Sequence, residues 1–597
     1  MTPSDSPSMS IADANAALTA PGQIFEMEER EIRGIPTRTW KNAPPSLRAV
    51  IDMSLAHGDA VFLVYEDERT TFAEHYRIAC TLAHRLRTTF GVEQGDRVAI
   101  IMRNLPEWVM AFWAATLAGA IVVPLNAWWS GEELRYGLED SGSKVAFVDT
   151  QRAESVRPFL GGLDTLKALI VADEHRTPAE TPLAVYEPTG GAALVPEWPF
   201  PLALGDVDEA ASPPDLTLDP EDDATIFYTS GTTGRPKGAV GTHRNMCTNL
   251  MSLFFLNTRG GMRFGSSPFE ETEKAERSQP AFLLSVPLFH ATGCHSVMVS
   301  NIAAGGKLVM MHHWDPERAL ELIERERIAT FGGVPAMVMQ VLDSPNFKKF
   351  DTSSIRGVSY GGAPAPPDLV RRIREAWPIG QPSNGYGLTE TSSVTSMNSG
   401  ADYVAKPDSA GPPVPVCDVA VLPEDYAKEE PDDSVPRGPG VRGELWIKGP
   451  NVVRGYWNRP EETAKTFSRG WLHTGDVAQL DDENFIYIVD RAKDMIIRGG
   501  ENVYSVQVEA ALFEHPAVAD VAVIGVPEPT LGEEVGAVVV LRPGAKVTAD
   551  ELALHVKARL AGFMVPTHIW FRSEPLPRNP QGKVLKRELR EELVGSR

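Results

Sequence analysis

The segment YTSGTTGRPKGAV (Tyr228–Val240) directly follows the apolar run ATIF. Its glycines, hydroxyl side chains and Lys237 suit a phosphate, because backbone N–H groups and an ammonium offset anionic oxygens at close range. A P-loop would require G-x-x-x-x-G-K followed by Ser or Thr, whereas Pro236 precedes Lys237 and Gly238 follows it. The segment therefore predicts a phosphate-binding loop that is not a Walker A motif. On the loop alone, a flexible hairpin connection is the alternative.

Length and charge narrow the class of protein. A chain of 597 residues is too long for one core and suggests about two to four domains. Its 57 basic and 80 acidic residues give a formal net charge of −23. This balance argues against nucleic acid or an anionic membrane as a partner bound through bulk electrostatics, and an anionic ligand would need local basic groups.

The cysteines and the N-terminal sequence favour the cytoplasm. Residues 1–25 lack the basic and apolar segments of a secretory signal, and we expect them to form a loose tail. The cysteines are widely spaced and include no C-x-x-C pair, which indicates neither a zinc site nor a disulfide framework. They are Cys80, Cys247, Cys294 and Cys417. A reducing compartment fits this pattern.

An alternation of apolar strands and helices predicts the fold class. The uncharged run Trp108–Gly131 is long enough to raise the question of a transmembrane span, yet Gly, Pro and Asn interrupt it. We interpret it instead as part of a buried βαβ unit between strands at Arg97–Ile101 and Ala120–Leu125. Similar alternation farther along predicts parallel sheets covered by helices, with no transmembrane segment. Three polar stretches are expected to be surface loops or linkers: 173–223, 263–280 and 423–440.

Seven further sequence blocks follow the phosphate loop in order. They are PLFHATG (Pro287–Gly293), YGGAPAP (Tyr360–Pro366), NGYGLTET (Asn384–Thr391), GELWIKGPNVVRGYW (Gly443–Trp457), GWLHTGDV (Gly470–Val477), DRAKDMIIRGGENVYS (Asp490–Ser505) and LPRNPQGKVLKREL (Leu576–Leu589). With the loop, they resemble the adenylate-forming (AMP-binding) superfamily of acyl-CoA synthetases, adenylation domains and luciferases, in particular its fatty-acid–CoA ligase branch. The resemblance covers roughly Gly58–Leu589, and eight blocks in order are far more specific than one.

The resemblance implies an α/β fold in two parts. A large N-terminal domain with helix-covered sheets is expected over residues 1–492, and a small, mobile α+β domain over residues 493–597. It also implies a two-step ligase. A carboxylate attacks the α-phosphate of ATP to give an acyl-adenylate and pyrophosphate, and a thiol then displaces AMP to give a thioester. ATP, Mg²⁺ and coenzyme A are the implied cofactors, and a small-molecule carboxylic acid is the implied substrate. The oligomeric state stays open between monomer and homodimer.

By this resemblance, the nucleotide contacts a defined set of residues. Lys237 and the loop would hold the phosphates, the loop residues being Thr229, Ser230, Gly231, Thr232, Thr233 and Gly234. Glu390 and Thr229 match the magnesium position. Tyr386 would face the purine, beside Gly361, Gly362, Ala363, Asn384, Gly385, Gly387 and Thr389. Asp476 would accept the ribose hydroxyls, because a carboxylate has two acceptor oxygens, and Arg491 would help to hold the ribose.

The resemblance also implies how the second step becomes possible. Lys583, after the Gln-Gly turn, matches the catalytic lysine that reaches the acyl carboxylate and the α-phosphate. Lys493 matches the hinge about which the C-terminal domain rotates, and Gly499 and Gly500 would leave room for a pantetheine arm. For both lysines, the alternative role is that of an ordinary solvated charge on the protein surface.

The sequence says least about the acid and the acceptor thiol. His290 is expected to flank the carboxylate or to gate the pocket, with a structural histidine as the alternative, and no acid nearby would pair with an amino-acid substrate. The expected lining segments are apolar, and Gly332 and Gly333 are expected to keep the cavity open. A medium- to long-chain fatty acid or a bulky apolar acid is therefore predicted, with coenzyme A as acceptor. The alternatives are a ligase that loads an acyl carrier protein and a non-catalytic nucleotide-binding relative.

Overall fold

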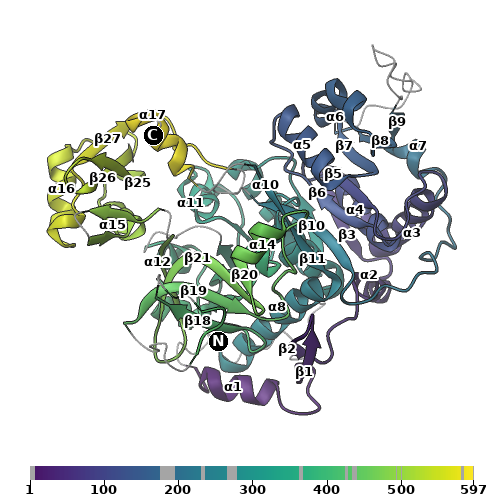
Figure 1. The fold of residues 1–597 in the computed structure, drawn as a ribbon, viewed down its shortest axis with the longest axis horizontal. Coiled ribbons are helices and arrows are strands. Elements are labelled where there is room, and N and C mark those ends of the chain that lie inside the picture. Colours follow the sequence, from purple (N-terminus) through teal and green to yellow (C-terminus); the bar gives the residue numbers. More distant parts are fainter. Residues whose placement is uncertain are drawn as a thin grey trace.

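The computed structural model describes residues 7–174, 195–229, 235–264, 279–361, 368–423, 426, 428–432, 440–491, 494–498, 501–579 and 584–595. Figure 1 shows the small C-terminal domain, in yellow, set apart from the N-terminal α/β part in blue and teal. The fold is therefore α/β with a large and a small part, as the resemblance implied.

A seven-stranded sheet carries the phosphate loop at one edge. Its order is β11 (Lys237–Thr242), β10 (Asp223–Thr229), β6 (Ile121–Pro124), β5 (Arg97–Ile101), β7 (Val145–Asp149), β8 (Ala168–Ala172) and β9 (Glu197–Pro199). All neighbours are parallel except β10 and β11, which form a hairpin. Its helices are α3 (Phe72–Thr88), α4 (Pro106–Leu117), α5 (Gly131–Ser141), α6 (Thr150–Val156) and α7 (Phe200–Leu204). Because α4 is buried on every side between β5 and β6, the βαβ interpretation is confirmed.

An eight-stranded sheet forms the centre of the N-terminal part. Its order is β17 (Ser396–Ser399), β16 (Gln381–Tyr386), β15 (Gly357–Gly361), β14 (Thr330–Gly333), β12 (Ala281–Leu284), β13 (Lys307–Met310), β3 (Val61–Tyr65) and β4 (Glu68–Thr71). Only the edge strands β17 and β4 run antiparallel to their neighbours. The accompanying helices are α2 (Leu47–Met53), α8 (His243–Phe264), α9 (Val299–Ala304), α10 (Pro316–Glu326), α11 (Pro335–Asp343), α12 (Leu369–Ala376), α13 (Gly400–Ala405) and the π-helix η3 (Thr292–Met298).

Two smaller sheets complete the architecture. The first contains β18 (Asp418–Leu422), β19 (Arg442–Lys448), β20 (Phe467–Ser468), β21 (Trp471–Leu480) and β22 (Ile486–Arg491), next to α14 (Pro460–Thr466). The C-terminal domain has β23 (Ile496–Arg498), β24 (Glu501–Val503), β25 (Val518–Glu528), β26 (Gly532–Leu541) and β27 (His568–Arg572), with α15 (Ser505–Phe513), α16 (Ala549–Lys557) and α17 (Lys586–Val594). It has its own apolar core, which fits the expected α+β unit.

The N-terminal segment corrects one expectation. Residues 7–25 are not a loose tail, because α1 (Ile11–Leu18) is capped by Ser10 and lies against α8. The Ser8 N–H also donates to the Arg263 carbonyl at 2.8 Å. The hairpin of β1 (Met27–Ile32) and β2 (Ile35–Trp40) follows. The mixed composition of this segment hid the helix, which is stabilised by its tertiary contact with α8.

The expected surface stretches are only partly described. Residues 175–194, 265–278 and 433–439 lie outside the described residues. Within 195–223, β9 adds an edge strand to the seven-stranded sheet, so part of the expected linker belongs to that sheet. In the described part of the chain, no helix combines the length and the apolar character that crossing a membrane requires.

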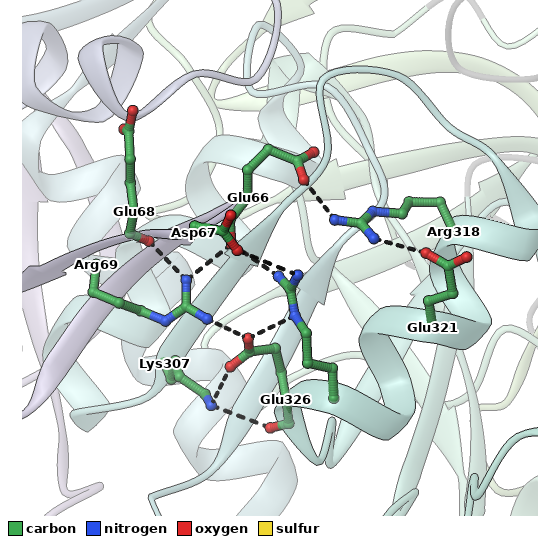
Figure 2. Close-up of polar contacts among 9 residues, drawn as sticks. Glu66, Asp67, Glu68, Arg69, Lys307, Arg318, Glu321 and Glu326 are labelled. Atoms are coloured by element: carbon green, nitrogen blue, oxygen red, sulfur yellow. Dashed lines mark hydrogen bonds and ion pairs between the residues drawn. The ribbon is translucent and has the colours of Figure 1, made fainter. Parts of the chain in front are cut away.

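An ion cluster joins the β3–β4 edge of the eight-stranded sheet to α10 (Figure 2). Glu326, whose side chain is 7% exposed, accepts from Arg69 at 2.6 Å, from Lys307 at 2.8 Å and from Arg325 at 3.1 Å. Burial opposes ionisation, yet the contacts with these cations hold the pKa of Glu326 below its usual value. We call these four residues the Glu326 cluster, and it connects segments more than 200 residues apart in the sequence.

Candidate active site

A cleft of about 2490 Å³ runs along β14, β15 and β16 and continues to the C-terminal domain. A single small-molecule site usually measures about 300–1,000 Å³, so this cleft has room for more than one substrate. The expected site residues that line it are Thr229, Lys237, His290, Gly361, Gly385, Tyr386, Gly387, Thr389 and Glu390. Ligands in open α/β sheets usually bind beyond the carboxyl ends of the strands, which is where most of these residues lie.

The β10–β11 hairpin holds the ends of the phosphate loop. Thr229 and Lys237 are opposite each other in the ladder, and the Thr229 hydroxyl donates to the Lys237 carbonyl at 3.4 Å. On one side, the Tyr136 hydroxyl of α5 donates to the Pro236 carbonyl at 2.9 Å. On the other side, the Trp457 N–H donates to the Gly238 carbonyl at 2.7 Å. The hairpin is therefore supported at both edges, which fixes the direction in which the loop leaves the sheet.

Glu390 belongs to an assembly of three side chains. It lies in the short 3₁₀ helix η5 (Thr389–Thr391), directly after β16. Its carboxylate accepts from the Tyr456 hydroxyl at 2.8 Å, and Lys237 Nζ lies 5.1 Å from the centre of the Tyr456 ring. Burial and the Glu390 charge raise the pKa of Tyr456, so the phenol stays protonated and donates. A neutral phenol thus stands between a cation and a carboxylate.

Tyr456 is a site residue that the motif reasoning did not assign. It belongs to the block GELWIKGPNVVRGYW, and its position at the end of that block was the available signal. Its ring contacts Lys237 while its hydroxyl contacts Glu390, although the three residues come from three separate blocks.

A second pair joins the expected purine and ribose positions. The Tyr386 hydroxyl donates to Asp476 Oδ2 at 2.7 Å, and Asp476 is 3% exposed. Asp476 lies on β21, and Arg491 is directly opposite it in the β21–β22 ladder. The structure therefore brings the side chains of Tyr386 and Asp476 into contact, with the backbone of Arg491 beside Asp476 in the sheet. A carboxylate with two acceptor oxygens can hold the tyrosine hydroxyl and still accept from a ligand.

The ends of β15 and β16 approach each other closely. A Cβ at Gly361 would lie 2.4 Å from the Gly385 carbonyl oxygen, so a larger residue would force the strands apart. Ser383, Gly385 and Tyr386 of β16 line the cleft. Asn384 lies between Ser383 and Gly385 on β16, opposite Tyr360 of β15 and Asn398 of β17, and its contact with the nucleotide stays a prediction.

His290 lies between β12 and η3 and lines the cleft. Burial lowers the pKa of its imidazole to about 3, so the ring is neutral near pH 7. Such a ring offers a carboxylic acid a hydrogen bond and no positive charge. The remaining expected site residues lie outside the described residues: Ser230, Gly231, Thr232, Thr233, Gly234, Gly362, Ala363, Lys493, Gly499, Gly500 and Lys583.

The segment that contains Lys583 begins and ends beside the cleft. Arg578 and Val584 form an antiparallel bridge, and the Leu585 N–H donates to the Pro577 carbonyl at 2.8 Å. Asn579 and Val584 line the cleft. The described residues on both sides of 580–583 therefore line the same cleft as Tyr386 and Glu390.

Buried charges lie next to the expected hinge. Asp490, which is 2% exposed, accepts from the backbone N–H of Ser505 and from its hydroxyl, the latter at 3.0 Å. Lys586 Nζ in turn contacts Ser505 Oγ at 2.6 Å and Glu509 at 2.7 Å. These contacts link β22, the start of α15 and the start of α17 on both sides of residues 492–493.

Comparison with known proteins agrees with this geometry. Residues 53–457 match the family model of the AMP-binding enzymes, and residues 507–583 match that of the AMP-binding enzyme C-terminal domain. The chain is 36% identical over 521 residues to a feruloyl-CoA synthase of Amycolatopsis sp, covering 87% of this chain and 93% of the relative. It is 33% identical over 568 residues to a long-chain-fatty-acid–CoA ligase of Bacillus subtilis (strain 168), covering 92% and 94%.

A solved structure shares the whole architecture. The o-succinylbenzoate CoA synthetase from Bacillus subtilis, in complex with its acyl-adenylate intermediate, superposes with a TM-score of 0.72 at 29% identity. The match covers 93% of this chain and 99% of that one. The chain belongs to the AMP-binding enzyme family, and the family resemblance in its sequence blocks is confirmed.

Proposed function

We propose that this enzyme activates a medium- to long-chain fatty acid or a bulky apolar acid and transfers it to coenzyme A. The chain is an AMP-forming acid–thiol ligase. One observation carries the proposal: a single cleft is lined by the phosphate hairpin, by Glu390 and by Asn579 and Val584 of the C-terminal domain, and it continues along strands β14 to β16.

The phosphate end of the cleft has the chemistry that the first step requires. Lys237, at the end of the phosphate loop, offers a cation to the phosphates. Glu390 and Thr229 supply carboxylate and hydroxyl oxygens, the ligand types that Mg²⁺ prefers, so the donor set fits this ion. When bound, Mg²⁺ offsets phosphate charge. Tyr456 keeps the Glu390 carboxylate oriented with a neutral hydrogen bond and leaves its charge available to the ion.

The adenosine end uses Tyr386 and Asp476. The Tyr386 ring lines the cleft and offers a flat face to the purine, while its hydroxyl orients Asp476. Asp476 accepts the ribose hydroxyls, with Arg491 opposite it in the ladder. Gly387 and Thr389 line the same part of the cleft. These side chains hold the α-phosphate where an incoming carboxylate can reach it.

Lys583 and the hinge account for the two steps. Lys583 stabilises the negative charge that develops on the α-phosphate, in the arrangement in which the flanking Asn579 and Val584 line the cleft. Rotation at Lys493, between domains of residues 1–492 and 493–597, removes this lysine and presents the segment of Gly499 and Gly500 to the pantetheine arm. The acyl carbonyl is then open to the thiol, and AMP leaves.

The acid channel is long and largely apolar. It extends from Gly361 and Gly385 to Thr330 and Gly357, at the opposite ends of the strands. At ~3.3 Å per residue, a five-residue strand gives the channel a length of roughly 13 Å. Arg356 and Gln381 border its distal end, so that end is polar, whereas His290 near the phosphates is neutral. The apolar length of the channel suits a hydrocarbon body, with the carboxylate at the phosphate end and the far end of the acid next to Arg356 and Gln381.

Besides the expected Gly332 and Gly333, two further glycines line the cleft and border open space. A Cβ at Gly260 of α8 would meet only Ser399 Oγ at 4.0 Å, and one at Gly385 only Met397 Cε at 3.6 Å. By contrast, a Cβ at Gly332 would lie 1.5 Å from the Ser359 carbonyl oxygen. Gly332 is therefore required by the close approach of β14 and β15.

The test is a substrate panel. The purified enzyme is incubated with ATP, Mg²⁺, coenzyme A and, in turn, acetate, octanoate, palmitate, cinnamate and phenylalanine, and AMP and thioester are measured. We expect the highest kcat/KM for octanoate, palmitate or cinnamate; acetate or phenylalanine as best substrate contradicts the proposal. Replacing coenzyme A by an acyl carrier protein tests the alternative acceptor. A chain that binds ATP but forms neither product is a non-catalytic relative.

A further inference from the structure

The turn that carries Glu390 has an unusual backbone. Ser392 and Ser393, directly after η5, have φ angles of 52° and 97°. Residues with a side chain rarely adopt positive φ, and two in succession persist only where the surroundings hold them. A Cβ at Gly387 would lie 1.4 Å from the Ser393 carbonyl oxygen, so the turn folds back tightly on the end of β16. The direction of Glu390 therefore depends on whatever supports this turn.

The π-helix η3 supports the turn at two points. His295, which is 2% exposed, contacts the Ser392 carbonyl through Nδ1 at 3.1 Å. Ser296 Oγ contacts Ser393 Oγ at 2.7 Å. A carbonyl oxygen only accepts, so the imidazole donates from Nδ1. π-Helical turns are rare and are frequently found at functional sites.

The buried ring of His295 is suited to a fixed, neutral role. Its ring packs edge-on against Phe227 of β10, with centroids 4.7 Å apart and planes at 85°. Burial lowers the pKa of His295 to about 4, which the hydrogen bond to Ser392 opposes in part, so the imidazole is uncharged near pH 7. One ring thus contacts both the strand that leads into the phosphate loop and the turn that carries Glu390.

We propose that His295 is a positioning residue that aims Glu390 at the metal–nucleotide complex by holding the Ser392 carbonyl. This inference rests on the proposed role of Glu390 and assigns to His295 no contact with substrate. Thr292, Ser296 and Val297 of the same helix line the cleft. The helix η3, which lines the cleft, therefore also supports the turn that carries Glu390.

Three substitutions at one position separate this role from simple packing. His295→Asn places an amide N–H close to the position of Nδ1, whereas His295→Gln places it closer to the position of Nε2. His295→Ala removes the donor. The binding of α,β-methylene-ATP, which cannot release pyrophosphate, is measured by calorimetry with Mg²⁺ and, separately, with EDTA.

We expect the Ala and Gln variants to lose about tenfold in affinity with Mg²⁺, the size typical when a ligand's supporting hydrogen bond is removed. The Asn variant should remain within about twofold of the wild type, and all variants should bind alike in EDTA. Equal affinities for the Asn and Gln variants, or an equal loss with and without Mg²⁺, overturn the proposal.

Two controls keep the test decisive. Ser296→Ala removes the second support and keeps the buried ring of His295. We expect this variant to lose less affinity for the ATP analogue than His295→Ala, and only with Mg²⁺. This result can be obtained even if a His295 variant fails to fold. If the loss of affinity across the variants instead parallels the fall in their thermal unfolding midpoints, the role of His295 is structural only and the proposal is overturned. If the wild type itself gains no affinity from Mg²⁺, the metal role of Glu390 fails, and this result is visible before any variant is compared.

Discussion

Glu326 and Glu390 lie at opposite ends of the eight-stranded sheet and have opposite surroundings. Glu326 is buried among three cations, Arg69, Lys307 and Arg325 (Figure 2). The described partner of the Glu390 carboxylate is the neutral hydroxyl of Tyr456. A carboxylate whose charge is already offset by the protein joins segments of the fold. One that is oriented by a neutral donor keeps its charge for a ligand.

The first prediction removes the charge of Glu390. In Glu390→Gln, adenylate formation should fall by about 10³-fold, or about 4 kcal/mol, because the phosphates lose an oriented metal ligand. The thermal unfolding midpoint should stay the same or rise, since no described cation loses its partner. Pyrophosphate release measures the first step. Thioester formation from supplied acyl-adenylate is the control and should be nearly unchanged; an equal loss there would contradict the assignment.

The second prediction removes the charge of Glu326. Glu326→Gln should lower the free energy of unfolding by about 3 kcal/mol, because three neighbouring cations lose their common carboxylate. Activity per folded molecule should be unchanged. Urea unfolding measures the effect, and Glu321→Gln is the matched control. Glu321 is 49% exposed and pairs with Arg318 at 2.7 Å, so its loss should change stability by less than about 0.5 kcal/mol. Similar effects for both variants would remove the special role of the Glu326 cluster.

The third prediction tests the other neutral donor in the cleft. Tyr386→Phe removes the hydroxyl that orients Asp476 at 2.7 Å, and the KM for ATP should rise about fivefold, or about 1 kcal/mol. The KM for the acid should stay unchanged, because the substitution removes only the hydroxyl that contacts Asp476 and keeps the aromatic ring in the cleft. Steady-state kinetics with each substrate varied in turn provides the measurement. An unchanged KM for ATP would place Asp476 outside the ribose site.

The fourth and smallest expected effect concerns pH. The pKa of Glu326 in the folded protein lies below its ordinary value of 4.5, so its contribution to stability is complete above about pH 4.5. The contribution is lost as the pH falls through the lower, folded-state pKa. The free energy of unfolding should therefore fall more steeply below pH 4.5 in the wild type than in Glu326→Gln. Urea midpoints at several pH values test this, and parallel curves would contradict it.

Much of the site was predictable because its motifs are local. The phosphate hairpin, the turn after β16 and the Asp476 strand each depend on a short run of turn residues or alternating apolar residues, which a single sequence displays. The face of the sheet that a given strand residue occupies was not predictable in the same way. A single-residue difference in strand phase turns a side chain to the other face of the sheet, and the phase relative to the cavity depends on packing.

By itself, the sequence determined the family, the order of the blocks and the alternation of strands and helices, because each of these depends on residues that are close together in the sequence. The tertiary structure decided which carboxylate is surrounded by cations and which is oriented by a neutral phenol in the cleft. Tyr456 and Glu390 are 66 residues apart, and Arg69 and Glu326 are 257 apart. Such pairs meet only through the strand order of the sheets. The charge of each acid is the same in the sequence, and its role follows from the neighbours that this order supplies.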